Sequence, residues 1–216
     1  MKIHCIGEKN SVFNRFIAEM RDIQLQKDSM RFRRNLERTG EIFAYEISKT
    51  LDYKAQEVQT PLGIATCFLP ENQIIIASIL RAGIPLHNGL LHYFDQAQNA
   101  FIAAYRKYGR DNKFTIQIEY MAAPNIDDKV LIITDPMLAT GASALLTYQH
   151  LLQKGRPKHC HFVSVIASRE GVAFLSRQLP KKGVTIWLGA IDEELTIKSY
   201  IIPGLGDAGD LAYGEK

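Results

Sequence analysis

The stretch VLIITDPMLATGASALL, residues 130–146, decides the fold that we expect for this chain of 216 residues. Its first part, Val130–Thr134, is apolar throughout and has the length of a strand. Such continuous runs are typical of strands that are covered on both faces of a parallel sheet. Residues 141–154 then carry apolar side chains at helical spacing and end at a glycine that suits a helix cap. The pattern predicts a buried strand, a turn that begins with Asp135, and a helix that begins near Thr140-Gly141.

Further apolar runs of strand length, with helical patterns between several of them, extend this arrangement. The runs cover residues 74–80, 100–105, 162–167 and 185–191. The helical patterns cover residues 29–51, 85–96 and 169–179, and Gly40 weakens the first of them enough to predict a break there. The alternation of strands and helices favours an α/β fold with an open, doubly wound sheet.

Residues 114–120, FTIQIEY, differ because their apolar and polar side chains alternate, which indicates a strand with one wet face. Residues 105–108 precede them across the turn-like cluster Gly109-Arg110-Asp111-Asn112. These features predict a β-hairpin that projects from the sheet as a candidate lid. A strand end and a turn are also expected over residues 58–63.

Composition limits the classes of protein that fit. Hydrophobic residues make up 46% of the chain, which is enough for a sizeable core in one domain. Basic residues gather at positions 31–38 and 154–158, but such clusters are usually solvated faces. We therefore expect no nucleic-acid partner, and a small anionic substrate would suit the net charge of +3 equally well.

Neither a metal centre nor a membrane anchor is expected. The chain has three widely separated cysteines and no CxxC pair. In His159-Cys160-His161 the thiol faces away from both imidazoles if the segment is a strand, so we expect two surface histidines there. Because no apolar stretch approaches the length of a membrane span, a cytoplasmic protein is expected.

Asp135 and the helix after it have the chemistry of a sugar-phosphate site. Ligands of open α/β sheets bind outside the carboxyl ends of the strands, where Asp135 could accept hydrogen bonds from vicinal sugar hydroxyls. The amides and hydroxyls of Thr140–Ser143 would attract a phosphate at the start of the helix. An ordinary aspartate turn followed by a threonine helix cap is the alternative.

Two other segments favour the sugar-phosphate interpretation. Ser78–Gly83 ends a strand in a cation and a tight turn, which suits a diphosphate, although such an arginine is otherwise a surface ion-pair partner. Residues 203–210, PGLGDAGD, hold three glycines and two acids, which argues against a regular element. Such a loop exposes backbone donors and acceptors that could bind a small planar ring, unless it is a floppy tail.

The motifs DPMLATG (residues 135–141), LRAG (80–83) and PGLGDAGD (203–210) resemble those of the uracil phosphoribosyltransferase family, and further matches cover almost the whole chain. The resemblance implies the type I phosphoribosyltransferase fold, an open parallel sheet flanked by helices, with a hood and a β-hairpin lid. It implies a single domain over residues 1–216, a flap around residues 105–122, and a base-binding C-terminal loop over residues 200–211. The reaction implied joins uracil to phosphoribosyl pyrophosphate (PRPP) and yields UMP and pyrophosphate.

The resemblance also implies a role for each matching residue. The catalytic residues would be Arg81, Arg106 and Asp207. PRPP would be bound by these three and by Asp135, Pro136, Met137, Leu138, Ala139, Thr140, Gly141, Ala142 and Ser143. Uracil would be bound by Ile201, Gly206, Asp207 and Ala208, mainly through the backbone. Mg²⁺ would enter with PRPP and would not be held tightly by the protein alone.

The implied partners are uracil, PRPP and further copies of the chain, in a homodimer or a larger homo-oligomer, and some relatives are activated by GTP. The chain departs from the family pattern at Pro85, Asn88, Ala142 and Leu211, so activity or base preference is open. Two other functions fit the same motifs. One is a non-catalytic regulator that senses a nucleotide and presents its basic face to RNA or protein, and the other is a transferase for another base.

Overall fold

The computed structural model describes the backbone of residues 1–108 and 114–215 and the side chains of residues 1–104 and 117–215. Its centre is an eight-stranded sheet, in which every pairing is parallel except that of the edge strand β6 with β5. In spatial order its strands are β1 (Lys2–Cys5), β10 (Val184–Asp192), β9 (His159–Ser168), β7 (Val130–Thr134), β4 (Ile74–Leu80), β5 (Gln98–Tyr108) and β6 (Phe114–Ala122), with the short β8 (Met137–Leu138) beside β9.

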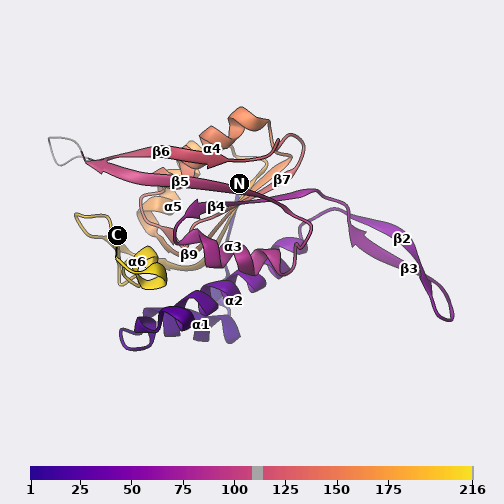
Figure 1. Cartoon of the computed structure of the whole chain (residues 1–216), viewed down its shortest axis with the longest axis horizontal. Coiled ribbons are helices and arrows are strands. Elements are labelled where there is room, and N and C mark those ends of the chain that lie inside the picture. The colour runs from indigo at the N-terminus through magenta and orange to yellow at the C-terminus, as the bar shows by residue number, and fades with distance from the viewer. Residues whose placement is uncertain (109–113, 216) are drawn as a thin grey trace.

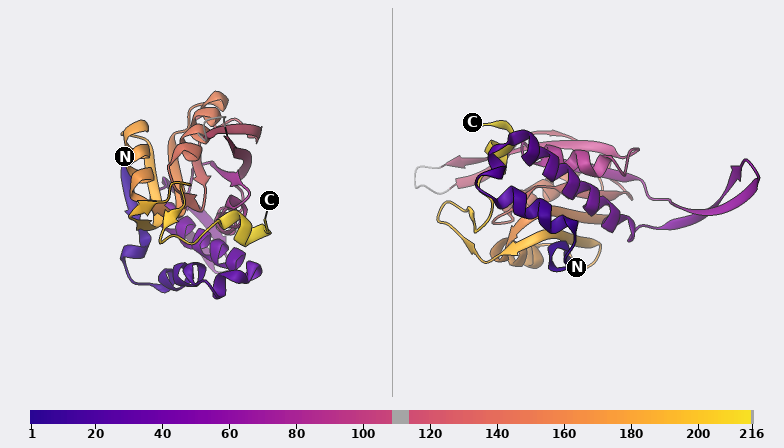
Figure 2. Two further views of the ribbon diagram at one scale, coloured as in Figure 1. Left: turned by 90° about the vertical axis from the view of Figure 1, so that its left-hand side faces the viewer. Right: turned by 90° about the horizontal axis from the view of Figure 1, so that it is seen from below.

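Helices cover both faces of this sheet (Figures 1 and 2). One face packs against α1 (Val12–Arg21), α2 (Ser29–Ser48) and α3 (Gly83–Leu91), and the other against α4 (Ala142–Leu151) and α5 (Arg169–Gln178). Successive residues of β4 enter opposite cores, because Ile76 belongs to the first cluster and Ile75 and Ala77 to the second. The doubly wound sheet expected from the apolar runs is therefore confirmed.

The remaining elements are short or peripheral. They are the 3-10 turns η1 (Ile6–Glu8), η2 (Leu25–Lys27) and η3 (Leu152–Lys154), the paired strands β11 (Glu194–Leu195) and β12 (Ile201–Ile202), the hairpin β2 (Tyr53–Thr60) and β3 (Gly63–Pro70), and the C-terminal α6 (Ala208–Tyr213). None of the helices in the described part of the chain is long and apolar enough to cross a membrane.

The predicted break at Gly40 is wrong, because α2 runs through it without interruption. A Cβ atom at Gly40 would lie 2.4 Å from the carbonyl oxygen of Leu86 in α3. Similarly, a Cβ atom at Gly89 in α3 would lie 2.0 Å from the carbonyl oxygen of Glu37 in α2. The two glycines therefore allow the backbones of α2 and α3 to touch, and Gly40 serves packing rather than a turn.

The prediction of two surface histidines at the start of β9 is wrong for His161, which is buried. Its Nδ1 accepts a hydrogen bond of 3.0 Å from Nε1 of Trp187, and its ring lies 4.5 Å from that of His159. Burial, with smaller contributions from His159 and His4, lowers the pKa of His161 to about 3. A neutral imidazole therefore fills this part of the core.

Two hairpins leave the body of the molecule at opposite ends (Figure 1). The predicted hairpin is confirmed as β5 paired antiparallel with β6, and the turn predicted over residues 109–112 lies outside the described residues. It extends at the end where the C-terminal segment lies, as both views show (Figures 1 and 2). The turn expected over residues 58–63 joins β2 to β3, and this second hairpin points away from the opposite end.

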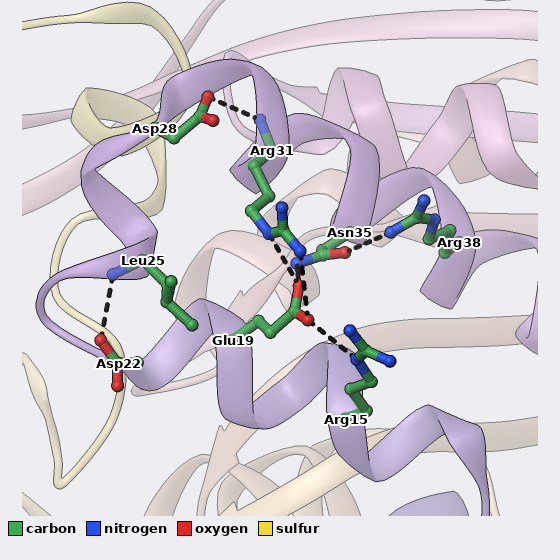
Figure 3. A network of polar contacts seen from close by, with 8 residues as sticks. All are labelled: Arg15, Glu19, Asp22, Leu25, Asp28, Arg31, Asn35 and Arg38. Atoms are coloured by element: carbon green, nitrogen blue, oxygen red, sulfur yellow. Dashed lines mark hydrogen bonds and ion pairs between the residues drawn. The ribbon is translucent and has the colours of Figure 1, made fainter.

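A buried carboxylate joins α1 to α2 (Figure 3). Glu19 accepts hydrogen bonds from Arg31 (3.0 Å), Asn35 (2.9 Å) and Arg15 (3.0 Å). These partners, Arg31 first, then Asn35 and Arg15, lower the pKa of Glu19 to about 2. Arg38, which donates to Asn35 and lies over the ring of Phe16, extends the network along α2.

We expect Glu19→Gln to destabilise the protein by about 2 kcal/mol at neutral pH, since it removes charge-assisted hydrogen bonds. The folded pKa of Glu19 is depressed, so its contribution is complete above the ordinary value of 4.5 and is lost as the pH falls toward about 2. The Tm of the variant should therefore lie roughly 4–8 °C below that of the wild type at pH 7. Thermal unfolding measured at pH values from 7 to 2 gives the difference in Tm between variant and wild type, which should shrink as the pH falls toward 2.

Glu46→Gln is the matched control, because Glu46 pairs with Lys49 on the exposed side of α2. Such pairs contribute about 0–1 kcal/mol, so its Tm should follow that of the wild type. A Glu19→Gln difference that persisted unchanged to pH 2 would contradict the electrostatic origin of the effect.

Candidate functional site

Asp135 begins a tight turn at the carboxyl end of β7. Its backbone N–H donates to the carbonyl of Val163 in β9 (3.1 Å), which continues the sheet by one residue. Its side-chain Oδ1 accepts a hydrogen bond from the N–H of Met137 (3.2 Å). The half-buried carboxylate therefore lies at the edge where the ligands of such sheets bind.

The residues after Asp135 are attached to β9 by their backbone. The carbonyl oxygen of Pro136 accepts hydrogen bonds from Val165 and Ile166, both 3.0 Å long, and β8 pairs in parallel with β9 through Met137 and Leu138. The segment expected to wrap a phosphate is thus held as an extra short strand.

Ser168, at the end of β9, forms a hydrogen bond with Ala139, the next residue of this segment. Its hydroxyl donates to the carbonyl of Ala139 (2.5 Å) and accepts from the N–H of Gly171 (2.8 Å), which also caps α5. A Cβ atom at Gly171 would lie only 2.2 Å from the carbonyl oxygen of Ala139. None of the three motifs includes Ser168 or Gly171, and the one signal for them in the sequence is a serine before a helical pattern.

The helix α4 begins at Ala142, and its N-cap is Gly141 with a φ of 80° rather than the threonine of the alternative interpretation. The Thr140 hydroxyl oxygen lies 3.4 Å from the N–H of Ala142. Gly141 is also close to α5, because a Cβ atom there would lie 3.1 Å from the carbonyl oxygen of Gly171. Ser143 stands in the first turn, where amides without helical partners favour an anion.

The turn that follows β4 lies directly beside the end of β7. A Cβ atom at Gly83 would lie 2.6 Å from Oγ of Ser78 and 2.9 Å from the carbonyl oxygen of Thr134. The helix α3 can therefore begin only where a glycine admits this approach. Ser78 pairs in parallel register with Thr134. The turn that carries Arg81 therefore lies next to the strand end that carries Asp135.

Arg81 also contacts the C-terminal segment. Its Nη2 donates to Oδ1 of Asp210 (3.2 Å) and to the carbonyl of Gly214 (3.0 Å). The structure therefore brings together two segments, residues 80–83 and 203–210, that lie far apart in the sequence.

The expectation that residues 203–210 form no regular element is wrong at the end of this range. The Oδ1 atom of Asp207 accepts hydrogen bonds from the N–H groups of Gly209 (2.8 Å) and Asp210 (3.1 Å), and this cap starts α6 at Ala208. The side chain of Asp207 is thus engaged with its own backbone, and its predicted role toward PRPP stays a prediction.

The residues expected to contact a base have different surroundings. Ile201 and Ala208 are buried in the core cluster of α1 and α2, whereas Gly206 is exposed with a φ of 93°. Leu211, where the family pattern differs, packs against the same cluster and approaches the open side of Gly206. An exposed glycine backbone next to buried apolar side chains suits contact with a flat ring.

Arg106 lies in β5, opposite Ile116 of β6. Its side chain lies outside the described residues, so its predicted contact with pyrophosphate stays a prediction. The β5–β6 hairpin extends from the body of the molecule at the end where the C-terminal segment lies (Figures 1 and 2).

Among the other departures from the family pattern, Pro85 is buried in α3, Asn88 is half-buried there, and Ala142 is the first residue of α4. Between the first two lies His87, whose Nε2 is 2.8 Å from Oδ1 of Asn99, an oxygen that accepts a hydrogen bond, and burial lowers the pKa of this histidine. These substitutions are accommodated within regular helices.

Solved structures place the fold. The chain resembles that of a protein from Aquifex aeolicus, with a TM-score of 0.86, 29% identity, and coverage of 98% of both chains. A hypoxanthine phosphoribosyltransferase from Staphylococcus aureus has a TM-score of 0.52 over 86% of this chain and 83% of its own; at 13% identity this likeness concerns the fold alone. The fold is that of a type I phosphoribosyltransferase.

The chain belongs to the uracil phosphoribosyltransferase family. The family model described as uracil phosphoribosyltransferase matches residues 8–215. A protein of that name from Porphyromonas gingivalis is 54% identical over 216 residues, all of both chains. Another, from Pyrococcus furiosus, is 37% identical over 202 residues, which cover 92% of this chain and 84% of the relative. The family resemblance of the three motifs is thereby confirmed.

We expect Gly171→Ala to weaken PRPP binding at residues 135–143, the segment expected to hold the phosphate, because the added methyl group would push the carbonyl of Ala139 away from Ser168. The affinity for PRPP, measured by calorimetry, should fall by about tenfold or more, as small misplacements in such sites have large effects. Val172→Ala, one residue further along α5, is the control. An unchanged affinity in a folded Gly171→Ala protein would show that this contact does not shape the site.

Proposed function

We propose that this protein transfers the phosphoribosyl group of PRPP to uracil and releases UMP and pyrophosphate. Family membership supports the reaction. The observation that carries it is the meeting of three segments at one edge of the sheet. The turn of Arg81 lies against the end of β7 through Gly83 and Thr134, and Arg81 joins the C-terminal segment through Asp210.

Each segment would bind one part of the reactants. Asp135 would accept hydrogen bonds from the ribose hydroxyls, and the start of α4 would hold the 5′-phosphate. Arg81 would bind the pyrophosphate group, and Arg106 would close over it from the hairpin. Backbone groups around Ile201 and Gly206 would pair with uracil.

The reaction needs positioning more than a strong acid or base. The bond between C1 of the ribose and the pyrophosphate oxygen breaks, N1 of uracil forms the new bond to C1, and the N1 proton is released. Loosening of the first bond ahead of the second leaves positive charge on the ribose and negative charge on the departing pyrophosphate. Guanidinium groups stabilise that departing charge, and an ordered site brings the two reactants together.

Mg²⁺ is proposed as the ion that enters with PRPP. Within the described residues, no group of three acids, histidines or cysteines could hold a metal ion. Mg²⁺ commonly binds through one or two carboxylates together with substrate phosphates, so Asp207 beside a bound diphosphate fits this donor set. The ion would neutralise phosphate charge, while Arg81 orients the leaving group.

The structure weakens the alternative of an RNA-binding regulator. Of the arginines between residues 31 and 38, Arg31 pairs with Glu19, and Arg34 pairs with Glu37 and Glu41. Arg38 lies over Phe16. Because these arginines already pair with carboxylates or lie against an aromatic ring, little of their positive charge is available to bind phosphate groups.

A GTP effector and a cytoplasmic location stay predictions.

The direct test is an assay of purified protein with labelled uracil, PRPP and Mg²⁺, in which we expect UMP. Arg81→Gln should lower kcat/KM for PRPP by about 10²–10³-fold, the usual cost of one donor to a developing charge. Arg177→Gln, on the exposed side of α5, is the control. Absence of UMP from the wild type would refute the reaction, and full activity in Arg81→Gln would refute the role of that residue.

We also propose that the protein is a homodimer built through the β2–β3 hairpin. A two-stranded hairpin alone is marginally stable, yet this one projects from the body with large apolar side chains exposed. Ile64 is 66% and Phe68 69% exposed, and these residues alternate on one face of β3, while Leu62 at the turn is fully exposed. A second copy of the chain is the occupant that we propose for this face.

The double substitution Ile64→Lys and Phe68→Glu should convert a dimer to a monomer, because it puts charges into the apolar contact. Sedimentation equilibrium measures the mass. Gln56→Lys, on the opposite face of the hairpin, is the control and should leave the mass unchanged. A monomeric wild type would refute the dimer, whereas a dimeric double variant would place the interface elsewhere.

A further inference from the structure

An ion pair outside the three motifs holds the segment that would contact the base. Arg21 ends α1 and Asp192 ends β10. Nη1 and Nη2 of Arg21 bind the two carboxylate oxygens of Asp192, each at 2.7 Å. The carboxylate is nearly buried, with 7% of the side chain exposed, so this bidentate pair is well ordered and shielded from water.

Both polar backbone atoms of Gly204 are bound to this pair. Its N–H donates to Oδ2 of Asp192 (2.9 Å), and its carbonyl accepts from Nη1 of Arg21 (3.0 Å). One acidic and one basic side chain therefore bind the N–H donor and the carbonyl acceptor of a single residue. We refer to Arg21, Asp192 and Gly204 as the Gly204 clamp.

Gly204 is the point at which the base-binding segment changes direction. Its φ is +54°, and a Cβ atom there would lie 2.2 Å from the carbonyl oxygen of Ile201, so only glycine fits. Ile201 precedes this turn, and Gly206 and Ala208 follow it. The conformation of Gly204 thus sets the position of the backbone at Ile201 relative to the backbone at Gly206 and Ala208, the two parts that would contact the base.

We propose that Arg21 and Asp192 are positioning residues for uracil. They touch neither reactant in this arrangement, but they fix the backbone that would bind the base. A site that recognises a ring through main-chain donors and acceptors depends on their mutual orientation, because no side chain can adjust to a misplaced peptide. This inference rests on the proposed function.

A merely structural ion pair would behave differently from a positioning pair. Loss of stability alone lowers the fraction of active enzyme and leaves the KM of both substrates unchanged. Loss of positioning raises the KM for uracil and spares the KM for PRPP, because Asp135, Ser168 and α4 are held by other contacts.

The test is steady-state kinetics of Asp192→Asn, Arg21→Lys and Arg21→Gln. We expect the KM for uracil to rise by about tenfold or more in Asp192→Asn and Arg21→Gln, and less in Arg21→Lys, which keeps one charged donor. The KM for PRPP should stay within about threefold. Arg169→Gln is the matched control, since Arg169 pairs with Glu193, the neighbour of Asp192, on the exposed surface.

An unchanged KM for uracil in an active variant, or an equal rise in both KM values, overturns the inference and leaves the proposed function standing. A wild type that makes no UMP overturns the proposed function and the inference with it. If the variants fail to fold, amide exchange in the wild type decides. The Gly204 N–H should exchange far more slowly than that of exposed Gly206, and equal rates would show that no clamp exists.

Discussion

The parallel pairing of β7 with β4 on one side and β9 on the other is the constraint on which the site depends. Ser78 lies opposite Thr134 and Thr134 opposite Val163, so the carboxyl ends of these three parallel strands point to the same edge of the sheet, with β9 continuing to Ser168. The chain then has to leave that edge three times in little space. It does so through Arg81 and Gly83, through Asp135, and through Ser168, and each exit places a polar side chain or backbone amide at the same edge. A shift of one residue in either pairing would turn these side chains to the opposite face.

Backbone groups do much of the binding that the proposed function requires, and this explains where the supporting side chains lie. The carbonyl of Ala139 is held by Ser168, the amides at the start of α6 are held by Asp207, and Gly204 is held by Arg21 and Asp192. Each of these side chains uses its hydrogen bonds to fix a peptide rather than to reach outward. Polar groups that fix a peptide shape a site only if their own positions are fixed, which is why Ser168 and Asp192 are buried.

The sequence alone was a good guide to the sheet, since the runs at 74–80 and 130–134 coincide with β4 and β7, and the alternation at 114–120 lies within β6. It was a poor guide wherever a contact between residues far apart in the sequence decides the local structure. Gly40 lies inside a helix because Leu86 approaches it there, and His161 is buried because Trp187 offers it a donor. For the same reason the motifs marked Asp135 and Arg81 but gave no sign of Ser168 or of the pairing of Arg21 with Asp192. Those partners lie 29 and 171 positions from the groups that they bind.

The two cores of the molecule support different segments of the candidate site. The layer of α4 and α5 supports the segment that begins at Asp135, because Gly171 and Ser168 meet Ala139 there. The layer of α1, α2 and α3 supports the other two segments. α3 begins at the turn of Arg81 and touches α2 through Gly89, α2 is joined to α1 by Glu19, and α1 ends at Arg21, which binds Gly204. The turn of Arg81 and the segment around Gly204 are therefore linked through one continuous set of helix contacts. Since Arg81 and Asp210 join the same two segments directly, this path of contacts closes on itself.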